Sequence, residues 1–231
     1  MNTAKHTVSA FDEELDALRD MILEMGSRAS SATTDAIKAL NKRDSEKARA
    51  IVAADRDIDA LHHRAETAAV NIIALRAPMA DDLRVVVAAI KMSALLERTA
   101  DYAKNIARRV ERITIEFPDK TWDILSEMSS EAGAMLTDVV RAYAEGNAAA
   151  AETVVERDDI VDDLHDRLTA KLLKHMIKHP DSISQAAHLM FIGKHIERIG
   201  DQATNIAEMV AYAETGEQPD TRDTDRESLA A

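Results

Sequence analysis

Two segments of the sequence place two carboxylates and an amide at intervals of four residues. Residues four apart lie on one face of an α-helix, because each residue turns the chain by about 100°. The residues concerned are Glu97, Asp101, Asn105, Glu197, Asp201 and Asn205. Each segment therefore predicts a helix with a stripe of oxygen ligands, opposite the main apolar stripe of the same helix.

A second kind of stripe precedes each of these segments. It consists of two aspartates and a histidine at positions i, i+4 and i+7, which again share one helical face. These residues are Asp55, Asp59, His62, Asp158, Asp162 and His165. We expect neighbouring helices in each half of the chain to bring the two kinds of stripe together.

Such clusters of acids favour a bound cation. Carboxylates that lie close together repel one another and raise one another's pKa unless a cation lies between them. Oxygen ligands, an amide and an imidazole suit hard or borderline cations such as Mg²⁺, Mn²⁺, Ca²⁺, iron and Zn²⁺. We therefore predict one metal site, holding one ion or several, in each half of the chain.

An ordinary explanation competes with the metal hypothesis. A single pair of acids four residues apart is usually a solvated helix face. Arg98, Arg108 and Arg198 also offer surface ion pairs, each worth about 0–1 kcal/mol. The metal hypothesis is favoured because the acids recur in both halves, while positions that we expect at the surface differ. Examples of such differences are Lys104 against Thr204 and Tyr102 against Gln202.

The recurrence extends over most of the chain and indicates an internal duplication. A shift of 103 residues superimposes the two aspartate–histidine stripes and aligns Asp44 with Asn147. A shift of 100 residues aligns residues 97–107 with 197–207, where seven of eleven positions are identical. Three helices thus repeat as a unit, which predicts an all-α fold of two pseudo-symmetric three-helix bundles.

The pattern of apolar residues sets the expected elements. Apolar residues recur at three- and four-residue steps, as in amphipathic helices, and only 3% of residues are aromatic, which disfavours a β-sandwich. Asp44 and Asn147 are expected as helix N-caps. Six helices are predicted at residues 8–41, 44–76, 80–113, 120–145, 148–178 and 182–214. The predicted domains are residues 1–116 and 117–215, followed by a disordered polar tail at 216–231.

The composition excludes several classes of function. A net charge of −13 repels nucleic-acid phosphates, so we expect no nucleic-acid partner. The chain has no cysteine, so thiolate metal ligands are excluded. No apolar run approaches the roughly 20 residues that a membrane helix needs, and residues 1–15 lack the core of a signal peptide. We therefore expect a cytoplasmic protein without direct membrane insertion.

Several motifs together resemble the PhoU family. The pattern E-R-x-x-D-x-x-x-N-I-A, at residues 97–107 and 197–207, closely resembles that family's signature. The segment from Ile73 to Arg84 resembles the family's turn between its second and third helices. The stretch FDEELDALRDMILEMG resembles its opening, so the resemblance runs from Phe11 to Tyr212.

The resemblance implies metal clusters, in known cases of iron or zinc, held by the Glu and Asp of each signature. The implied ligands are Glu97, Asp101, Glu197 and Asp201, with Asp55, Asp59, Asp158 and Asp162 as neighbours. His62 and His165 stand where many members carry an acidic residue. The expected cofactor is a divalent or trivalent metal ion: iron, zinc, manganese or magnesium.

The resemblance also implies a negative regulator of phosphate uptake and of the phosphate-starvation response. Such a protein links the ATPase subunit of the phosphate ABC transporter to a membrane sensor histidine kinase when phosphate is plentiful. The family is often homodimeric. Partners of this kind imply a cytoplasmic protein that they recruit to the inner face of the membrane, and that is not an enzyme.

Two other functions remain open at this point. One is a carboxylate-bridged dimetal enzyme, an oxidase or phosphohydrolase. Such bundle sites use Glu-x-x-His motifs, and this chain has only Asp-x-x-His at Asp59/His62 and Asp162/His165. The other is a purely structural helical adaptor without metal.

Overall fold

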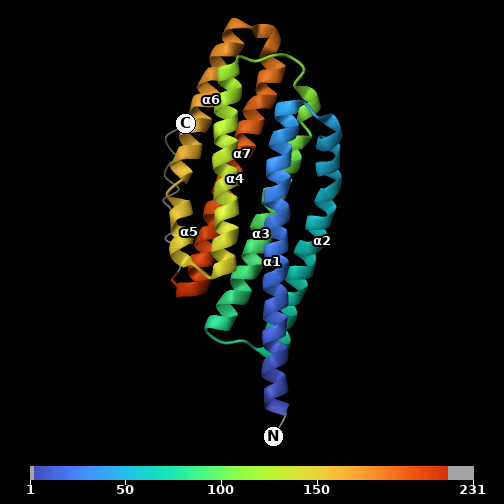
Figure 1. The fold of residues 1–231 in the computed structure, drawn as a ribbon, viewed down its shortest axis with the longest axis vertical. Coiled ribbons are helices and arrows are strands. Elements are labelled where there is room, and N and C mark those ends of the chain that lie inside the picture. Colours follow the sequence, from blue (N-terminus) through green and yellow to red (C-terminus); the bar gives the residue numbers. More distant parts are fainter. Residues whose placement is uncertain (1–2, 218–231) are drawn as a thin grey trace.

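The computed structural model describes residues 3–217 and consists of helices and connecting turns (Figure 1). The α-helices are α1 (Thr3–Lys42), α2 (Ser45–Arg76), α3 (Asp81–Ala107), α4 (Asp119–Glu145), α5 (Ala148–Val155), α6 (Asp158–Lys178) and α7 (Ile183–Thr215). Short 3₁₀ turns follow α3 and α6, at η1 (Val110–Arg112) and η2 (Pro180–Ser182). The described range contains no strand, which confirms the all-α prediction. Of the tail predicted to be disordered, residues 218–231 lie outside the described residues.

The helices form two groups that lie side by side along the long axis of the molecule (Figure 1). α1, α2 and α3 pack on one another in the first group, and α4, α5, α6 and α7 do so in the second. α3 packs against α7, and α1 packs against α4, so the buried apolar side chains form one continuous core. The two pseudo-symmetric bundles are thus confirmed, and the division into domains at residues 1–116 and 117–215 stays a prediction.

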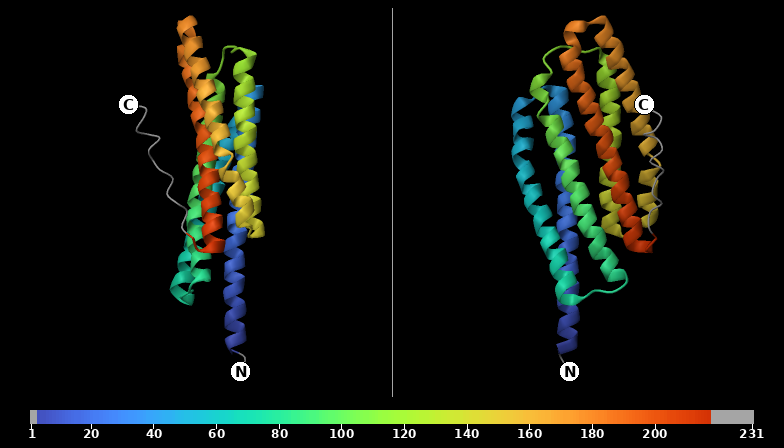
Figure 2. Two further views of the ribbon diagram at one scale, coloured as in Figure 1. Left: turned by 90° about the vertical axis from the view of Figure 1, so that its left-hand side faces the viewer. Right: turned by 180° about the vertical axis from the view of Figure 1, so that it is seen from behind.

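The outer edges of the molecule are formed by the second helix of each half. Figure 2 shows α3 and α7 next to each other, with α2 beyond α3 and the α5–α6 pair beyond α7. In each half, the acidic stripes predicted on the second and third helices can therefore face each other where these helices pack. Among the described residues, no helix is long and apolar enough to cross a membrane.

Both predicted N-caps are confirmed. Oδ1 of Asp44 accepts a hydrogen bond from the backbone amide of Lys47 at 2.9 Å. Oδ1 of Asn147 accepts one from the amide of Ala150 at 3.0 Å. Each cap satisfies an amide that the first turn of a helix leaves without a partner, and so fixes where the second helix of its half begins.

The prediction of one helix over residues 148–178 is wrong, because the helix is interrupted between α5 and α6. The amide of Arg157 donates to the carbonyl of Val154 at 3.2 Å, which tightens the turn to a 3₁₀ pattern. The guanidinium of Arg157 binds two acids of α4. Its Nε donates to Oε1 of Glu131 at 2.6 Å, and its Nη1 donates to Oδ2 of Asp138 at 2.7 Å. The interruption makes Asp158 the first residue of α6.

The helix predicted at residues 80–113 is also shorter than expected, since α3 ends at Ala107. The segment beyond it is held by α7. Oε1 of Gln185 accepts hydrogen bonds from the amides of Thr114 and Ile115, at 2.7 and 2.9 Å. These contacts satisfy backbone groups outside the helix, and the apolar spacing of the segment does not reveal them.

A ring stack joins α3 to α7. The rings of Tyr102 and His195 have centroids 5.7 Å apart, and the guanidinium of Arg198 lies 5.7 Å from the centroid of the Tyr102 ring. Tyr102 and Gln202 are both buried, so the expectation that these positions lie at the surface is wrong. Tyr102 packs across the junction between the halves, a contact that the pattern of a single repeat does not contain.

His195 is half-buried in this junction, and both nitrogens of its imidazole are shielded from solvent. Within the described part of the chain, neither of its ring nitrogens has a hydrogen-bond partner. Burial, followed by the positive charges of Arg109 and Arg198, lowers the pKa of His195 to about 4. The unfolded chain therefore binds this proton more readily than the folded protein, and the free energy of unfolding falls as pH falls from about 6.5 to about 4.

We expect His195→Leu to stabilise the protein. Leucine stands at the corresponding position of the first half, Leu95, and brings no buried polar nitrogen. The gain should be about 1 kcal/mol at pH 8 and larger at pH 5, where protonation opposes folding of the parent protein. Urea unfolding at the two pH values measures both gains. Equal gains at pH 5 and pH 8 would contradict the depressed pKa.

Candidate metal centre

Three carboxylates of α6 and α7 converge in the C-terminal half. Asp158 and Asp162 on α6 and Asp201 on α7 each offer one carboxylate oxygen, and these atoms all lie within 4.8 Å of one another. The three side chains are half-buried. The four-residue spacing puts Asp158 and Asp162 on one face of α6, and the packing of α6 on α7 brings Asp201 to that face. Oxygens at this separation can share one cation.

The surroundings of Asp201 change the pKa of its carboxyl group. Its pKa is raised to about 7 by burial, followed by the negative charges of Glu197, Asp158 and Asp162, with Lys194 opposing the rise. The acid thus resists ionisation in this position. A cation among the carboxylates would remove the main repulsion and favour the ionised form.

Glu197 and His165 lie beside this cluster. Nζ of Lys194 donates to Oε1 of Glu197 at 2.6 Å, and nearly half of the lysine side chain is exposed. Burial lowers the pKa of His165, while the charge of Glu197 acts to raise it. The imidazole of His165 is therefore neutral above its ordinary pKa and can offer a nitrogen lone pair. Asn205, one turn beyond Asp201, is also half-buried.

A lysine lies within the equivalent cluster of the N-terminal half. Nζ of Lys104 on α3 donates to Oδ2 of Asp55 on α2 at 2.5 Å, and it also donates to Oδ1 of Asp101. The side chains of Lys104 and Asp55 are only 15% and 10% exposed. Burial, the largest single cause, lowers the pKa of Lys104, but the hydrogen bonds and charges of Asp101 and Asp55 outweigh it and raise the pKa.

The other acids of the N-terminal half group around Glu97. Its pKa is raised by burial and by the negative charges of Asp101, Asp59 and Asp55, while the charge of His62 acts to lower it. The first half thus repeats the pairing of glutamate with histidine seen for Glu197 and His165. It differs in that an ammonium group is already bound between two of its carboxylates.

His62 has a defined orientation. The hydroxyl of Ser93 donates to the carbonyl of Ile90 at 2.8 Å, so its oxygen accepts from Nδ1 of His62 at 3.1 Å. Nε2 of His62 then lies 3.6 Å from Oε1 of Glu66, and Nδ1 of His63 lies 3.7 Å from Oε2 of that glutamate. Glu66 and Ser93 were not among the predicted site residues, although Glu66 stands four residues after His62.

The predicted site residues differ in their positions relative to the carboxylate clusters. The eight acids form the two clusters, and each histidine stands beside its cluster. Asn105 is oriented otherwise, because its side-chain oxygen accepts from Nη1 of Arg108 at 3.5 Å. Lys104 was interpreted as a variable surface residue, whereas it is the partner of two predicted ligands. Lys104 stands three residues after Asp101, a spacing that indicates an ion pair on one helical face.

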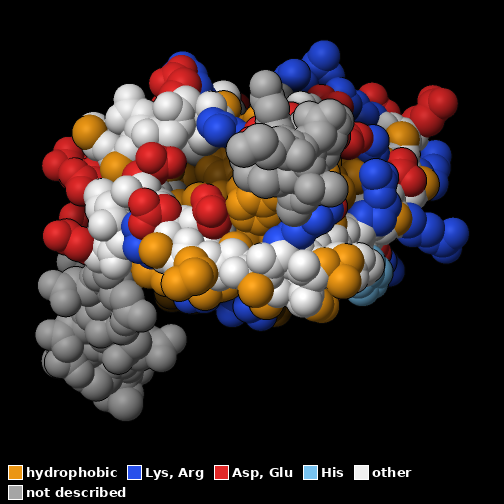
Figure 3. All heavy atoms as spheres, turned by 90° about the horizontal axis from the view of Figure 1, so that it is seen from below, with side chains coloured by type: hydrophobic (Ala, Val, Ile, Leu, Met, Phe, Trp, Pro, Cys, Tyr) orange, Lys and Arg blue, Asp and Glu red, His pale blue; other side chains and the backbone are white. Residues whose placement is uncertain are grey.

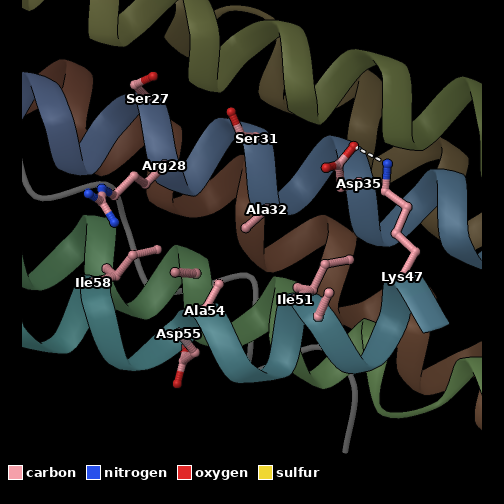
Figure 4. Close-up of a pocket in the computed structure, with 12 residues that line it drawn as sticks. Ser27, Arg28, Ser31, Ala32, Asp35, Lys47, Ile51, Ala54, Asp55 and Ile58 are labelled. Carbon is pink, nitrogen blue, oxygen red and sulfur yellow. Dashed lines mark ion pairs between the residues drawn. The ribbon is translucent and has the colours of Figure 1, made fainter. Parts of the chain in front are cut away.

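A pocket of about 340 Å³ lies between α1 and α2, and Asp55 of the N-terminal cluster is one of its lining residues (Figure 4). Its lining includes the ion pair between Lys47 and Asp35, whose Nζ and Oδ1 are 2.7 Å apart. Figure 4 shows the carboxylate of Asp55 directed away from α1. The pocket therefore borders the N-terminal cluster at Asp55, while the carboxylate of Asp55 is directed away from α1.

The fold and the acidic clusters together define the class of protein. Two pseudo-symmetric three-helix bundles, each with an acidic cluster between its second and third helices, make this a duplicated helical-bundle protein. The sequence profile of the PhoU domain matches residues 22–110 and 125–210. The chain therefore belongs to the PhoU family.

Relatives of the chain are similar over almost their whole length. A phosphate-specific transport system accessory protein PhoU homolog of Zymomonas mobilis is 47% identical over 229 residues, which span 98% of this chain and 95% of the relative. A homolog of the same name from Caulobacter vibrioides is 40% identical over 93% of this chain and 94% of its own length.

Solved structures agree with the fold. The crystal structure of PhoU from Pseudomonas aeruginosa matches with a TM-score of 0.86 and 31% identity, over 90% of this chain and 100% of that one. The phosphate transport system regulatory protein PhoU from Streptococcus pneumoniae matches with a TM-score of 0.84 and 28% identity, over 91% of this chain and 99% of that one.

The raised pKa of Asp201 predicts a pH dependence. The acid binds its proton more tightly in the folded, metal-free protein than in the unfolded chain, where its pKa is near the ordinary 3.8. Its contribution to the free energy of unfolding should therefore fall as pH rises from about 4 to about 7. Asp201→Asn should remove this contribution, as measured by urea unfolding in EDTA across that range.

Asp166→Asn is the matched control, because Asp166 is also on α6 and its side chain is 87% exposed. The control should reproduce the pH dependence of the parent protein. If Asp201→Asn and Asp166→Asn give the same slope, the acids of α6 and α7 do not interact as described.

Proposed function

We propose that this protein is an accessory regulator of phosphate transport that binds protein partners and holds a metal ion in its C-terminal carboxylate cluster. The observation that supports the role most strongly is the near full-length similarity to proteins named as phosphate-specific transport system accessory proteins. The similar structure from Streptococcus pneumoniae carries the name of a phosphate transport system regulatory protein.

In this proposal the protein is a negative regulator. It binds the ATPase subunit of the phosphate ABC transporter and the membrane sensor histidine kinase when phosphate is plentiful, and it represses both uptake and the starvation response. The protein acts in the cytoplasm, at the inner face of the membrane, and as a homodimer. Regulation then follows from differential binding, since a ligand or partner shifts an equilibrium only by its difference in affinity for two states.

Exposed apolar side chains support a role in binding proteins. At the turn between α2 and α3, the side chains of Leu75 and Met79 are 76% and 79% exposed. Viewed from the end of the molecule at which this turn lies, apolar side chains lie open between acidic and basic groups (Figure 3). Exposed apolar surface of this kind commonly marks a protein interface.

The metal part of the proposal rests on the fit of the C-terminal cluster. Asp158, Asp162 and Asp201 have oxygens close enough to share an ion, and burial followed by the charges of the neighbouring acids raises the pKa of Asp201. Glu197 and His165 are the neighbouring side chains that could complete the coordination. Iron, zinc, manganese and magnesium all suit such ligands, and an ion there would tie α6 to α7. The N-terminal cluster fits a metal less well, because Lys104 already binds Asp55 and Asp101.

The dimetal enzyme is not favoured as an alternative. The relatives are named as accessory proteins, and the Asp-x-x-His motif of the N-terminal half places His62 against Ser93 and Glu66. That histidine is therefore oriented by residues outside the motif. The proposed metal acts by holding helices in place, with no reaction at the ion.

We expect protein purified without chelator to contain metal, and Asp201→Asn to lose most of it, because the substitution removes a shared charged ligand. Metal at 100 times its dissociation constant should raise the free energy of unfolding by about 2.7 kcal/mol. Elemental analysis and thermal unfolding with and without EDTA measure the two effects. Asp166→Asn is again the control and should retain the metal. Metal-free parent protein whose unfolding ignores added Mn²⁺, Zn²⁺ and Fe²⁺ would refute the metal proposal.

The partner proposal predicts selective capture. Tagged protein should recover the transporter ATPase and the sensor kinase from membrane fractions of cells grown in high phosphate. Less should be recovered from phosphate-starved cells, as identified by mass spectrometry against a tag-only control. Leu75→Asp with Met79→Asp should reduce recovery about tenfold, because charged groups replace apolar contacts. Ile177→Asp, at an equally exposed apolar position of α6, is the matched control.

Recovery of neither partner under either phosphate condition would contradict the regulatory role. Equal losses with the α2–α3 turn variant and with Ile177→Asp would contradict the choice of that turn as the contact surface.

A further inference from the structure

The two halves of the protein differ in the basic residues beside their matched carboxylates. Position 104 of α3 carries lysine, and the corresponding position of α7 carries Thr204. Thr204 is buried and has no charge to offer. The matched acids are the same in both halves, so position 104 brings a positive charge to the N-terminal acids where the corresponding position 204 brings none.

The contacts of Lys104 are those of a cation bound between two helices. Its ammonium group donates to Asp55 of α2 at 2.5 Å and to Asp101 of its own helix. The duplication matches Asp55 with Asp158 and Asp101 with Asp201. Asp158 and Asp201 are two of the three acids whose oxygens converge in the C-terminal half. Lys104 therefore occupies, in the first half, the position between α2 and α3 that an ion would need.

We propose that Lys104 is the built-in cation of the N-terminal cluster, so that Asp55, Asp59, Glu97 and Asp101 bind no metal, whereas the matching acids of the C-terminal half do. The proposal rests on the metal site described under the proposed function. It adds that the duplicated site has diverged into one metal-dependent copy and one metal-independent copy. The first bundle then keeps its α2–α3 contact without metal, and only the α6–α7 contact responds to metal supply.

Lys194 does not make the C-terminal cluster equivalent. It binds Glu197, three residues away on the same helix, and its side chain is 46% exposed. Because the lysine end of this pair is open to solvent, it rearranges easily, although the Glu197 side chain is only 13% exposed. The Lys104 side chain is 15% exposed and joins two different helices, so replacing it with a metal would leave a buried ammonium without its partners.

Reciprocal substitutions test the proposal. Mn²⁺ and Zn²⁺ binding is measured by equilibrium dialysis with elemental analysis for the parent protein and its variants. In the parent, Asp201→Asn should remove the bound metal, while Asp101→Asn should leave it unchanged. Lys104→Thr, which installs the residue of the second half, should add a second site that Asp101→Asn then removes. Lys104→Arg is the control that keeps the charge and should add none.

Thr204→Lys is the converse variant and should reduce metal binding by the C-terminal half at least tenfold. It also keeps the proposal testable if Lys104→Thr fails to fold after losing the partner of Asp55. Metal in the parent protein that Asp101→Asn removes would overturn the role of Lys104 and leave the metal proposal standing. Absence of any metal from the parent would instead defeat the proposed metal site itself.

Discussion

The repulsion between carboxylates that helix packing forces together is the constraint on which both halves of this molecule depend. Each half packs its second helix on its third, and each of these helices brings acids to the shared face. Acids in that position must stay protonated, separate, or share a cation. In the first half the ammonium group of Lys104 offsets the repulsion between Asp55 and Asp101. In the second half, burial and then the charges of Glu197, Asp158 and Asp162 raise the pKa of Asp201.

The remaining architecture keeps these helix pairs in register. The continuous core ties α1 to α4 and α3 to α7, and the stack of Tyr102 on His195 lies at the second of these contacts. The two ion pairs of Arg157 hold α4 against the start of α6, directly before Asp158. A metal-dependent shift of α6 or α7 would act first on the side chains of α3 and α4 that pack against them.

Much of this structure could be predicted from the sequence, because it depends on local patterns. The two bundles and the paired acids could be predicted from helical periodicity, from the caps at Asp44 and Asn147 and from the duplication. The features that were missed depend on contacts between distant segments. Arg157 interrupts a helix through two acids of α4, and Tyr102 is buried by the other half of the molecule. Lys104 looked like a surface residue because its burial depends on Asp55, which lies 49 residues earlier in the chain.

The most direct test of this account is the position of metal in crystals of the parent protein grown with Mn²⁺ and measured at the manganese absorption edge. The account predicts anomalous signal between α6 and α7, among Asp158, Asp162 and Asp201, and none between α2 and α3 where Lys104 lies. Signal of equal strength in both halves, or none in either, would contradict it.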